Sequence, residues 1–294
     1  MIKRTLLPKL IAHLDNPEIS LIVGPRQAGK TTLMGLLIDH LKSQGKNSLF
    51  LNYDLDSDRP YFKSQTDLVG KIRLEIGNTG YVFLDEIQRK DNAGLFLKGL
   101  SDMNLPYKFV VSGSGSLELK EKIAESLAGR KRIFTLNPLS FEEFINFKTQ
   151  YHYEEKLVDY LKTDPEGGQK LLKEYLSFGG YPKVVTFETT EEKLEAIKDI
   201  FESYLEKDIL GLLNLKRTEN FSNLVRTLSS QMGKLINYSE LSSTLGITER
   251  TVKHYIWYLT KTFVGDKISP FTHRLRKEIV KSPVFYFTDT GLAN

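Results

Sequence analysis

Residues 19–42 read ISLIVGPRQAGKTTLMGLLIDHLK, which is an apolar run, a loop containing glycines and then a run whose apolar residues have helical spacing. The loop at residues 24–31 matches the pattern G-x-x-x-x-G-K-[ST] at every fixed position, between a strand and a helix as that pattern requires. Glycines let the loop turn its N–H groups onto phosphates, and the helix N-terminus adds partial positive charge. The sequence therefore predicts a phosphate-binding loop in preference to a chance glycine turn.

Each residue of this loop has an expected role in holding ATP with Mg²⁺. Lys30 is expected to neutralise the β- and γ-phosphates, in binding and in catalysis, and the Thr31 hydroxyl is expected to ligate the metal ion. Arg26 lies inside the loop, where its side chain either faces the phosphates or braces the loop. The other residues expected at the cofactor are Gly24, Pro25, Gln27, Ala28, Gly29 and Thr32.

Outward from the loop, short apolar runs alternate with helical patterns. Continuous apolar runs are typical of strands in a parallel sheet that is covered on both faces. The predicted strands span 19–23, 48–53, 81–85, 108–113 and 132–136. Helical patterns lie between them at 30–43, 66–76 and 91–101. This alternation predicts an α/β domain of the doubly wound kind.

Two acids end one of these predicted strands, in the segment YVFLDE at 81–86. The carboxyl end of a strand in an open parallel sheet borders the ligand crevice. We expect Asp85 to hold Mg²⁺ through its water shell and Glu86 to polarise the attacking water as general base. The alternative is a pair of solvated acids, which the presence of the phosphate-binding loop makes the weaker interpretation.

Two further features would complete a catalytic site. The strand at 108–113 leads into Ser112-Gly-Ser114, where Ser112, or else Ser114, could contact the γ-phosphate or the water; a flexible turn is the alternative. An arginine beside the γ-phosphate, from the same chain or from a neighbour, stabilises the transition state. Arg130 is the best candidate for that role and Arg132 is the next, although surface arginines are common.

The segment after residue 137 has mainly helical patterning. Ser140 followed by Glu143 predicts a capping box at the start of a helix. The segments TDPEGG at 163–168 and FGGYP at 178–182 are strong turn signals. The predicted organisation is a P-loop domain over 1–137, a helical lid over 138–215 and a winged-helix domain over 216–294.

The last of these segments has a helix-turn-helix pattern. A short helix carrying Leu241 would end at Gly246, and a second helix would begin near Thr248. The residues FVGDKISPF at 263–271 then predict a hairpin, or wing. DNA phosphates and bases would be met by Arg250, Lys253, His254 and the basic stretch 273–277. The alternative is a winged helix used for packing or protein contact, since Glu249 would face DNA unfavourably.

Composition sets wider limits. The 294 residues include no cysteine, which excludes thiol catalysis, disulfides and thiolate zinc sites and fits a reducing cytoplasm. No apolar run approaches a membrane span, and the basic start lacks a signal-peptide core. Residues 211–294 hold 12 Lys and Arg against 6 Asp and Glu, so the net charge of +4 divides into +6 there and −2 elsewhere. This excess hints at an anionic partner, although a solvated lysine-rich surface is the simpler interpretation.

With these motifs together, the chain resembles a prokaryotic family of AAA-type P-loop ATPases that carry a C-terminal domain of unknown function beginning with a winged helix. The resemblance spans nearly the whole chain and rests on GPRQAGKTTL, FLDEIQ, VSGSGS, LAGRKRIFTLNPLSFEEF, FGGYPKVV, SYLEKDI and VFYFTDTGLAN. It implies an AAA-like sheet, a helical lid, a winged helix and a cytoplasmic location. The ATP-site roles that it implies fall on Lys30, Thr31, Asp85, Glu86, Ser112 and Arg130.

This chain departs from the family pattern in one respect. Members usually continue past a segment like DTGLAN into a region that resembles a restriction endonuclease, whereas this chain ends at Asn294. Either this chain is a piece of a longer protein or this member lacks that region, and a nuclease-related role is therefore in doubt.

Three functions remain in view. The first is an ATPase that uses hydrolysis to drive a conformational switch, acting on DNA through the winged helix. The second is a signalling or scaffolding switch whose winged helix binds protein. The third is a small-molecule kinase, which ranks last because a winged helix is an odd appendage for it. A homo-oligomer is an open expectation, which an arginine acting in trans would require.

Overall fold

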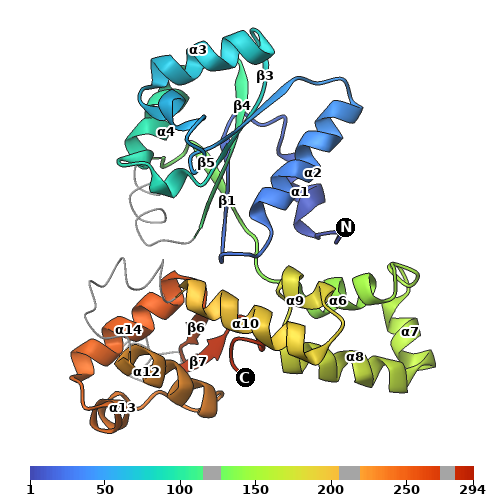
Figure 1. Ribbon diagram of the computed structural model, residues 1–294, viewed down its shortest axis with the longest axis vertical. Helices are drawn as coiled ribbons and strands as arrows, with labels where there is room; N and C mark the ends of the chain where they lie inside the picture. Colours follow the sequence, from blue (N-terminus) through green and yellow to red (C-terminus); the bar gives the residue numbers. More distant parts are fainter. Residues whose placement is uncertain (115–126, 205–218, 272–281) are drawn as a thin grey trace. The chain divides into compact units, whose positions relative to one another are not determined.

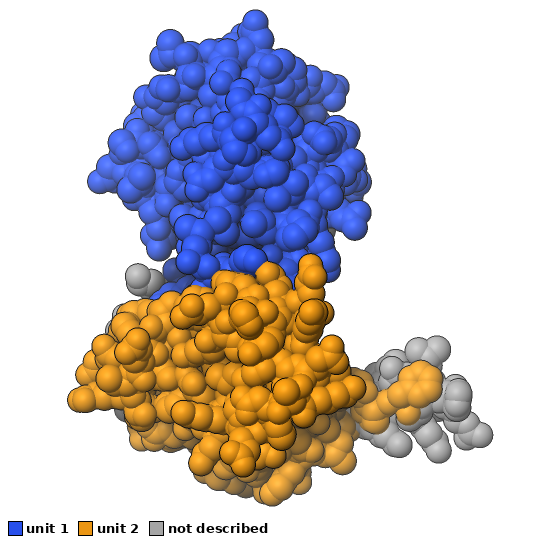
Figure 2. All heavy atoms as spheres, turned by 90° about the vertical axis from the view of Figure 1, so that its right-hand side faces the viewer, with its two compact units in different colours: residues 1–137 blue, residues 138–294 orange. Residues whose placement is uncertain are grey.

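The computed structural model describes residues 1–114, 127–204, 219–271 and 282–294. The chain divides into two compact units, Met1–Asn137 and Pro138–Asn294, which Figure 2 shows in different colours. The predicted boundary near residue 215 lies outside the described residues, so a separate lid and winged-helix domain stay a prediction. Within the described ranges, every helix is too short or too polar to span a bilayer.

The first unit is built around a five-stranded sheet in which neighbouring strands run parallel. The strands are β1 (Ile19–Gly24), β2 (Ser48–Asn52), β3 (Gly80–Asp85), β4 (Tyr107–Ser114) and β5 (Lys131–Thr135). They lie in the order β2-β3-β4-β1-β5, with each end within one residue of its predicted position. The predicted α/β fold is confirmed.

Helices cover the sheet on both faces (Figure 1). One face carries α1 (Leu6–Ala12) and α2 (Lys30–Ser43), and the other carries α3 (Gln65–Ile76) and α4 (Ala93–Asp102). Short 3-10 turns, η1 (Arg59–Phe62) and η2 (Ile87–Arg89), follow β2 and β3. The core under α1 and α2 is formed by apolar residues of alternate strand positions and of the two helices, including Leu10, Ile22, Leu33, Phe83, Val110 and Phe134.

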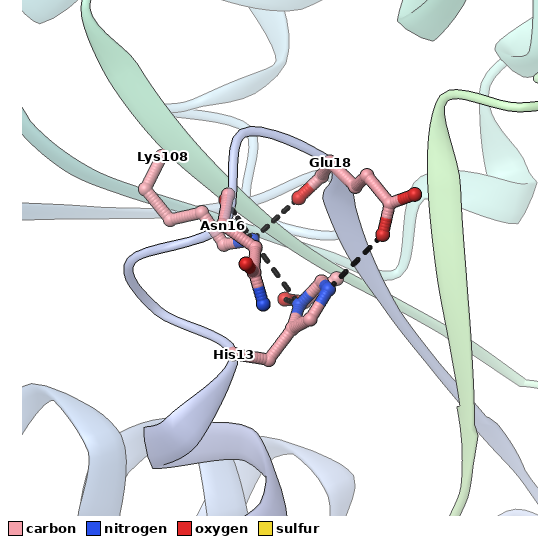
Figure 3. Close-up of polar contacts among 5 residues, drawn as sticks. His13, Asn16, Glu18 and Lys108 are labelled. Carbon is pink, nitrogen blue, oxygen red and sulfur yellow. Dashed lines mark hydrogen bonds and ion pairs between the residues drawn. The ribbon is translucent and has the colours of Figure 1, made fainter.

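A buried polar cluster closes the amino edge of the sheet (Figure 3). Lys108 is 7% exposed, and its ammonium donates to the carbonyl oxygens of Asn16, at 2.8 Å, and Glu18. It also lies 3.2 Å from Nδ1 of His13, which must be the acceptor because an ammonium only donates. His13 Nε2 faces the Glu18 carboxylate at 3.3 Å. These contacts tie the loop between α1 and β1 to β4.

Burial of Lys108 gives the stability of this unit a dependence on pH. Desolvation lowers the pKa of Lys108 from 10.5 to about 8, against the opposing charges of Glu18 and Asp15. Between these two values the unfolded chain binds more protons than the folded chain, so the contribution of Lys108 to stability rises with pH. We expect the free energy of unfolding, measured by urea titration, to rise from pH 8 to 10.5 relative to a Lys108→Met variant. A pH-independent difference between the two proteins would contradict this.

The second unit begins with helices. They are α6 (Phe141–Lys148), α7 (Leu157–Thr163), α8 (Pro165–Phe178), α9 (Pro182–Thr186) and α10 (Thr190–Tyr204). The capping box predicted at Ser140 and Glu143 is confirmed, and the FGGYP turn separates α8 from α9. The predicted break at 163–168 is wrong in extent, because α8 starts at Pro165 and takes both glycines into its first turns. A Cβ on Gly168 would lie 2.7 Å from the end of the Leu161 side chain, which would have to shift to make room.

The two helices and the glycine turn of the predicted helix-turn-helix are present. Helix α12 (Glu219–Ser230) precedes α13 (Tyr238–Leu245), which ends at Gly246 in the left-handed conformation. Helix α14 (Glu249–Lys261) then starts from a Thr248 N-cap.

The predicted hairpin within 263–271 is wrong. Strand β6 (Gly265–Ile268) pairs antiparallel with β7 (Val284–Phe287), which is much further along the chain. Phe285 of β7 lies in the same hydrophobic core as α12 and α14, so burial of this side chain favours the pairing. The basic stretch 273–277 lies outside the described residues.

One core joins the two parts of the second unit. Tyr181, the N-cap of α9, and Ile200 of α10 belong to the same buried cluster as Phe221 and Val252 of the helix-turn-helix region. The carboxylate of Asp289 accepts hydrogen bonds from the backbone N–H groups of Gly180, Gly291 and Leu292. The described parts of the predicted lid and winged helix are therefore packed together.

Candidate nucleotide site

The loop between β1 and α2 has the conformation that a phosphate cradle needs. Gly29 is the N-cap of α2 with φ of 96°, a conformation that other residues rarely adopt, and Gln27 has φ of 59°. Gly24 is required for another reason, since a Cβ there would lie 2.1 Å from the carbonyl oxygen of Leu136. The Leu136 N–H donates to the Val23 carbonyl at 2.8 Å, so the chain after β5 runs directly beside the start of the loop.

Lys30 lies folded back on this loop. Its side chain is buried, and Nζ donates to the carbonyl oxygens of Gly24, at 3.1 Å, and Pro25, at 2.8 Å. The ammonium is thus held inside the turn of the loop. Thr31 and Thr32, the next two residues, are exposed on the first turn of α2. Arg26 is half-buried, and its predicted choice between phosphate and loop stays open.

Asp85 is the centre of the polar contacts at the carboxyl edge of the sheet. Its carboxylate is fully buried and accepts a hydrogen bond from Thr31 Oγ1 at 2.6 Å. The hydroxyl of Ser112 on β4 donates to the other carboxylate oxygen, as does the backbone N–H of Glu86 at 3.1 Å. The helix start, β3 and β4 therefore meet at this one carboxylate.

Glu86 follows Asp85 in an unusual conformation. Its φ of 55° is left-handed, which costs a non-glycine residue about 1–2 kcal/mol. The amide of Gln88 donates to the Glu86 carboxylate and holds this side chain, a contact that the sequence did not predict. Backbone strain of this kind is concentrated at functional sites, where the surrounding structure maintains it.

The serine candidates are placed differently. Ser112 is buried and touches Asp85, so it is close to the predicted metal site. Ser114 lies at the end of β4, in register with Gly24 of β1. Ser116, at the end of the same serine-glycine segment, is outside the described residues.

Arg130 lies at the opposite edge of the sheet from the loop. Its carbonyl accepts from the N–H of Ile19 at the start of β1, and its Nε donates to Asp102 at 2.8 Å. Five residues of strand, about 16 Å at 3.3 Å per residue, separate this position from the loop. Arg132, in register with Ser20, is also remote. A role for either arginine in the site of its own chain is therefore wrong, and only a second copy of the chain could present one.

Sequence reasoning missed one residue that touches the loop. Arg4 is only 9% exposed, and its guanidinium donates to the carbonyl oxygens of Ala28, at 2.8 Å, and Asn137, at 2.5 Å. Neither a motif nor spacing could reveal these contacts, because the bonds join residues 24 and 133 positions apart.

The residues at this edge fit ATP with Mg²⁺. The loop supplies backbone N–H groups and the Lys30 ammonium for phosphates, as anion sites at helix N-termini do. The hydroxyl of Thr31 and the carboxylate of Asp85 touch each other, and both offer the oxygen ligands that Mg²⁺ prefers.

Comparison with known families gives each half of the chain a match. Residues 16–145 match the family described as AAA domain, and residues 169–294 match a family described as Domain of unknown function (DUF8612). Residues 16–145 are therefore similar to AAA domains and residues 169–294 to a domain of unknown function, and the predicted resemblance is confirmed.

Relatives are similar to this chain over most of its length. An uncharacterized protein of Haemophilus influenzae is 28% identical over 97% of this chain and 71% of its own length. Uncharacterized proteins of Methanocaldococcus jannaschii and Mycobacterium tuberculosis are 24% and 25% identical, and this chain spans 61% and 58% of their lengths.

Among solved structures, the Aeropyrum pernix ORC1 protein in complex with DNA is 14% identical, with 98% of this chain and 89% of that chain covered and a TM-score of 0.39. AMPPCP-bound DnaA from Aquifex aeolicus is 16% identical, with 87% and 86% covered and a TM-score of 0.37.

Proposed function

We propose that this protein binds ATP with Mg²⁺ and hydrolyses it at the carboxyl edge of the sheet. One observation carries the proposal: Thr31 of the phosphate-binding loop and Ser112 of β4 both donate hydrogen bonds to the carboxylate of Asp85 at the end of β3. A glycine turn or a pair of solvated acids would not require these contacts. In this proposal ATP hydrolysis by the first unit drives a conformational switch in the protein.

The residues divide the chemistry among them. Loop N–H groups and the Lys30 ammonium, released from Gly24 and Pro25, bind the phosphates and their developing charge. Thr31 and Asp85 would hold Mg²⁺, which would supply positive charge to neutralise the β- and γ-phosphates. Glu86, oriented by Gln88, accepts a proton from the attacking water. Ser112 donates a hydrogen bond to the Asp85 carboxylate and so orients that carboxylate.

The direct test is saturable binding. Purified protein is titrated with ATP and with GTP, with and without Mg²⁺, by calorimetry, and phosphate release is then measured at saturating nucleotide. The proposal requires a saturable isotherm and release of phosphate that depends on Mg²⁺. If neither triphosphate binds, the proposal is refuted. Binding without turnover would leave a nucleotide-binding module and refute the ATPase.

The second unit is proposed to bind DNA in response to nucleotide. Arg250 and Lys253 are exposed on α14, and Lys253 has a loose ion pair with Glu249 at 3.7 Å. Two such residues on the second helix of a helix-turn-helix are placed as groove contacts would be.

DNA binding has a measurable salt dependence. The logarithm of the binding constant should fall linearly with the logarithm of salt concentration, and Arg250→Ala or Lys253→Ala should each reduce the slope by about 1. Lys198→Ala, an exposed lysine of α10, is the control and should leave the slope unchanged. Fluorescence anisotropy of labelled duplex DNA measures this. No binding at low salt would eliminate DNA as the partner.

A protein partner is the second candidate, and a specific observation favours it. Leu235 and Ile268 flank Val284 across the small sheet, and they are 62% and 56% exposed. An exposed apolar row is the kind of surface that a protein contact buries. A nucleotide-dependent switch in a signalling or scaffolding assembly would use this face, and the Leu235→Ser variant would then lose the partner while DNA binding persists.

The oligomeric state decides whether Arg130 can reach a nucleotide site. Since Arg130 is remote from its own loop, its proposed catalytic role requires a neighbouring copy. A mass measurement in solution with and without ATP tests this, and a monomer under both conditions would exclude it.

A further inference from the structure

The N-terminal segment reaches the phosphate-binding loop through one side chain. Arg4 precedes α1, and its guanidinium is enclosed with 9% of the residue exposed. Nη1 donates to the Ala28 carbonyl inside the loop, and Nη2 donates to the carbonyl of Asn137, the last residue of the first unit. A single planar group therefore bonds the loop and the chain segment that leads into the second unit.

The first bond orients a peptide group of the loop. In a trans peptide the C=O and the following N–H point in opposite directions. Because the Ala28 carbonyl is turned toward Arg4, the N–H of Gly29 is turned away from it, and the loop around Lys30 can present this N–H to a phosphate. Gly29 has no Cβ, so the Ala28–Gly29 peptide can rotate more easily than most, and the bond from Arg4 can restrict that rotation.

The second bond reaches a constrained segment. Asn137 precedes Pro138, and a residue before proline is restricted to extended conformations. The preceding residue, Leu136, is bonded through its N–H to Val23 and packs its carbonyl against Gly24. The guanidinium has donors in a rigid fork, so a change in position of the Ala28 carbonyl is transmitted to the Asn137 carbonyl.

We infer that Arg4 is a positioning residue: it sets the Ala28–Gly29 peptide for phosphate binding and links the state of the loop to the segment at Leu136–Pro138. The inference rests on the proposed ATP function. A purely structural anchor is the competing account, in which Arg4 fixes the N-terminus and affects folding alone.

The experiment compares Arg4→Ala and Arg4→Lys with Leu14→Ala, a core variant beyond the other end of α1 that removes packing beside His13 at the amino edge of the sheet. ATP affinity, turnover and melting temperature are measured for each. Loss of one charge-assisted bond should weaken ATP binding by about 10-fold or more in Arg4→Ala. Leu14→Ala should lower the melting temperature at least as much and keep the wild-type affinity. Arg4→Lys should recover part of the affinity, since an ammonium can make the bond to Ala28 but lacks the fork.

Two further readouts separate positioning from stability. Millimolar guanidinium, far below denaturing concentrations, should restore part of the ATP affinity of Arg4→Ala and leave Leu14→Ala unchanged. Amide hydrogen exchange of the segment around Leu136 should respond to saturating ATP in the wild type and fail to respond in Arg4→Ala.

The outcomes are distinguishable. If the wild type binds no triphosphate, the ATP function and this inference both fall. If the wild type binds ATP and Arg4→Ala binds equally well despite a lower melting temperature, the positioning role is overturned while the ATP function stands. An exchange response that persists in Arg4→Ala at saturating ATP would overturn the link to Leu136–Pro138.

Discussion

Lys30→Ala should abolish measurable nucleotide binding while leaving the fold intact. The ammonium is buried in the turn of the loop and lies among backbone carbonyls, so it is placed to exchange these partners for phosphate oxygens. Charge-assisted hydrogen bonds are each worth about 1.5–3 kcal/mol, and the loss of two predicts at least about 100-fold weaker binding. Calorimetric titration with ATP and Mg²⁺ measures the loss.

The control for this substitution is Lys42→Ala. Lys42 is an exposed lysine in the last turn of the same helix, so its removal changes the charge of α2 without touching the loop. The control should bind ATP like the wild type. Equal affinities for Lys30→Ala and the wild type would contradict the assigned role of Lys30, and unfolding of Lys30→Ala is checked by its circular dichroism spectrum and melting temperature.

Glu86→Gln should keep ATP binding and stop turnover. The substitution preserves size and the ability to bond with Gln88, so the local conformation with φ of 55° is retained. A neutral amide cannot accept the proton of the attacking water, and general base catalysis typically contributes about 10²–10⁴-fold. Phosphate release at saturating ATP should fall by about that factor, with the affinity for ATP nearly unchanged.

A matched acid elsewhere in the same unit provides the control. Glu75→Gln removes a carboxylate that is paired with Lys71 on α3, away from the loop, and should leave turnover at the wild-type rate. If Glu86→Gln hydrolyses ATP as fast as the wild type, another group activates the water. If Glu86→Gln loses binding as well, Glu86 acts in holding the nucleotide.

The placement of Arg130 shows where sequence reasoning reached its limit. The arginine could be recognised as a candidate because catalytic arginines have a known purpose, but its distance from the loop depends on the direction of β5 in the sheet. Since β5 runs parallel to β1 and begins at Lys131, the preceding residue lies at the amino edge. A parallel sheet was predicted, but an edge strand such as β5 can also run antiparallel, so its direction was decided only by its pairing with β1.

The sequence by itself determined the features that depend on a few neighbouring residues. Loop, strand and cap patterns act over short windows, so the phosphate-binding loop, the five strands and the Ser140 capping box were all predictable. The tertiary structure alone decided which distant groups meet: Ser112 and Thr31 on Asp85, Arg4 on the loop, and β6 on β7. These contacts join residues far apart in the chain, and they form only when burial of the apolar faces brings their elements together.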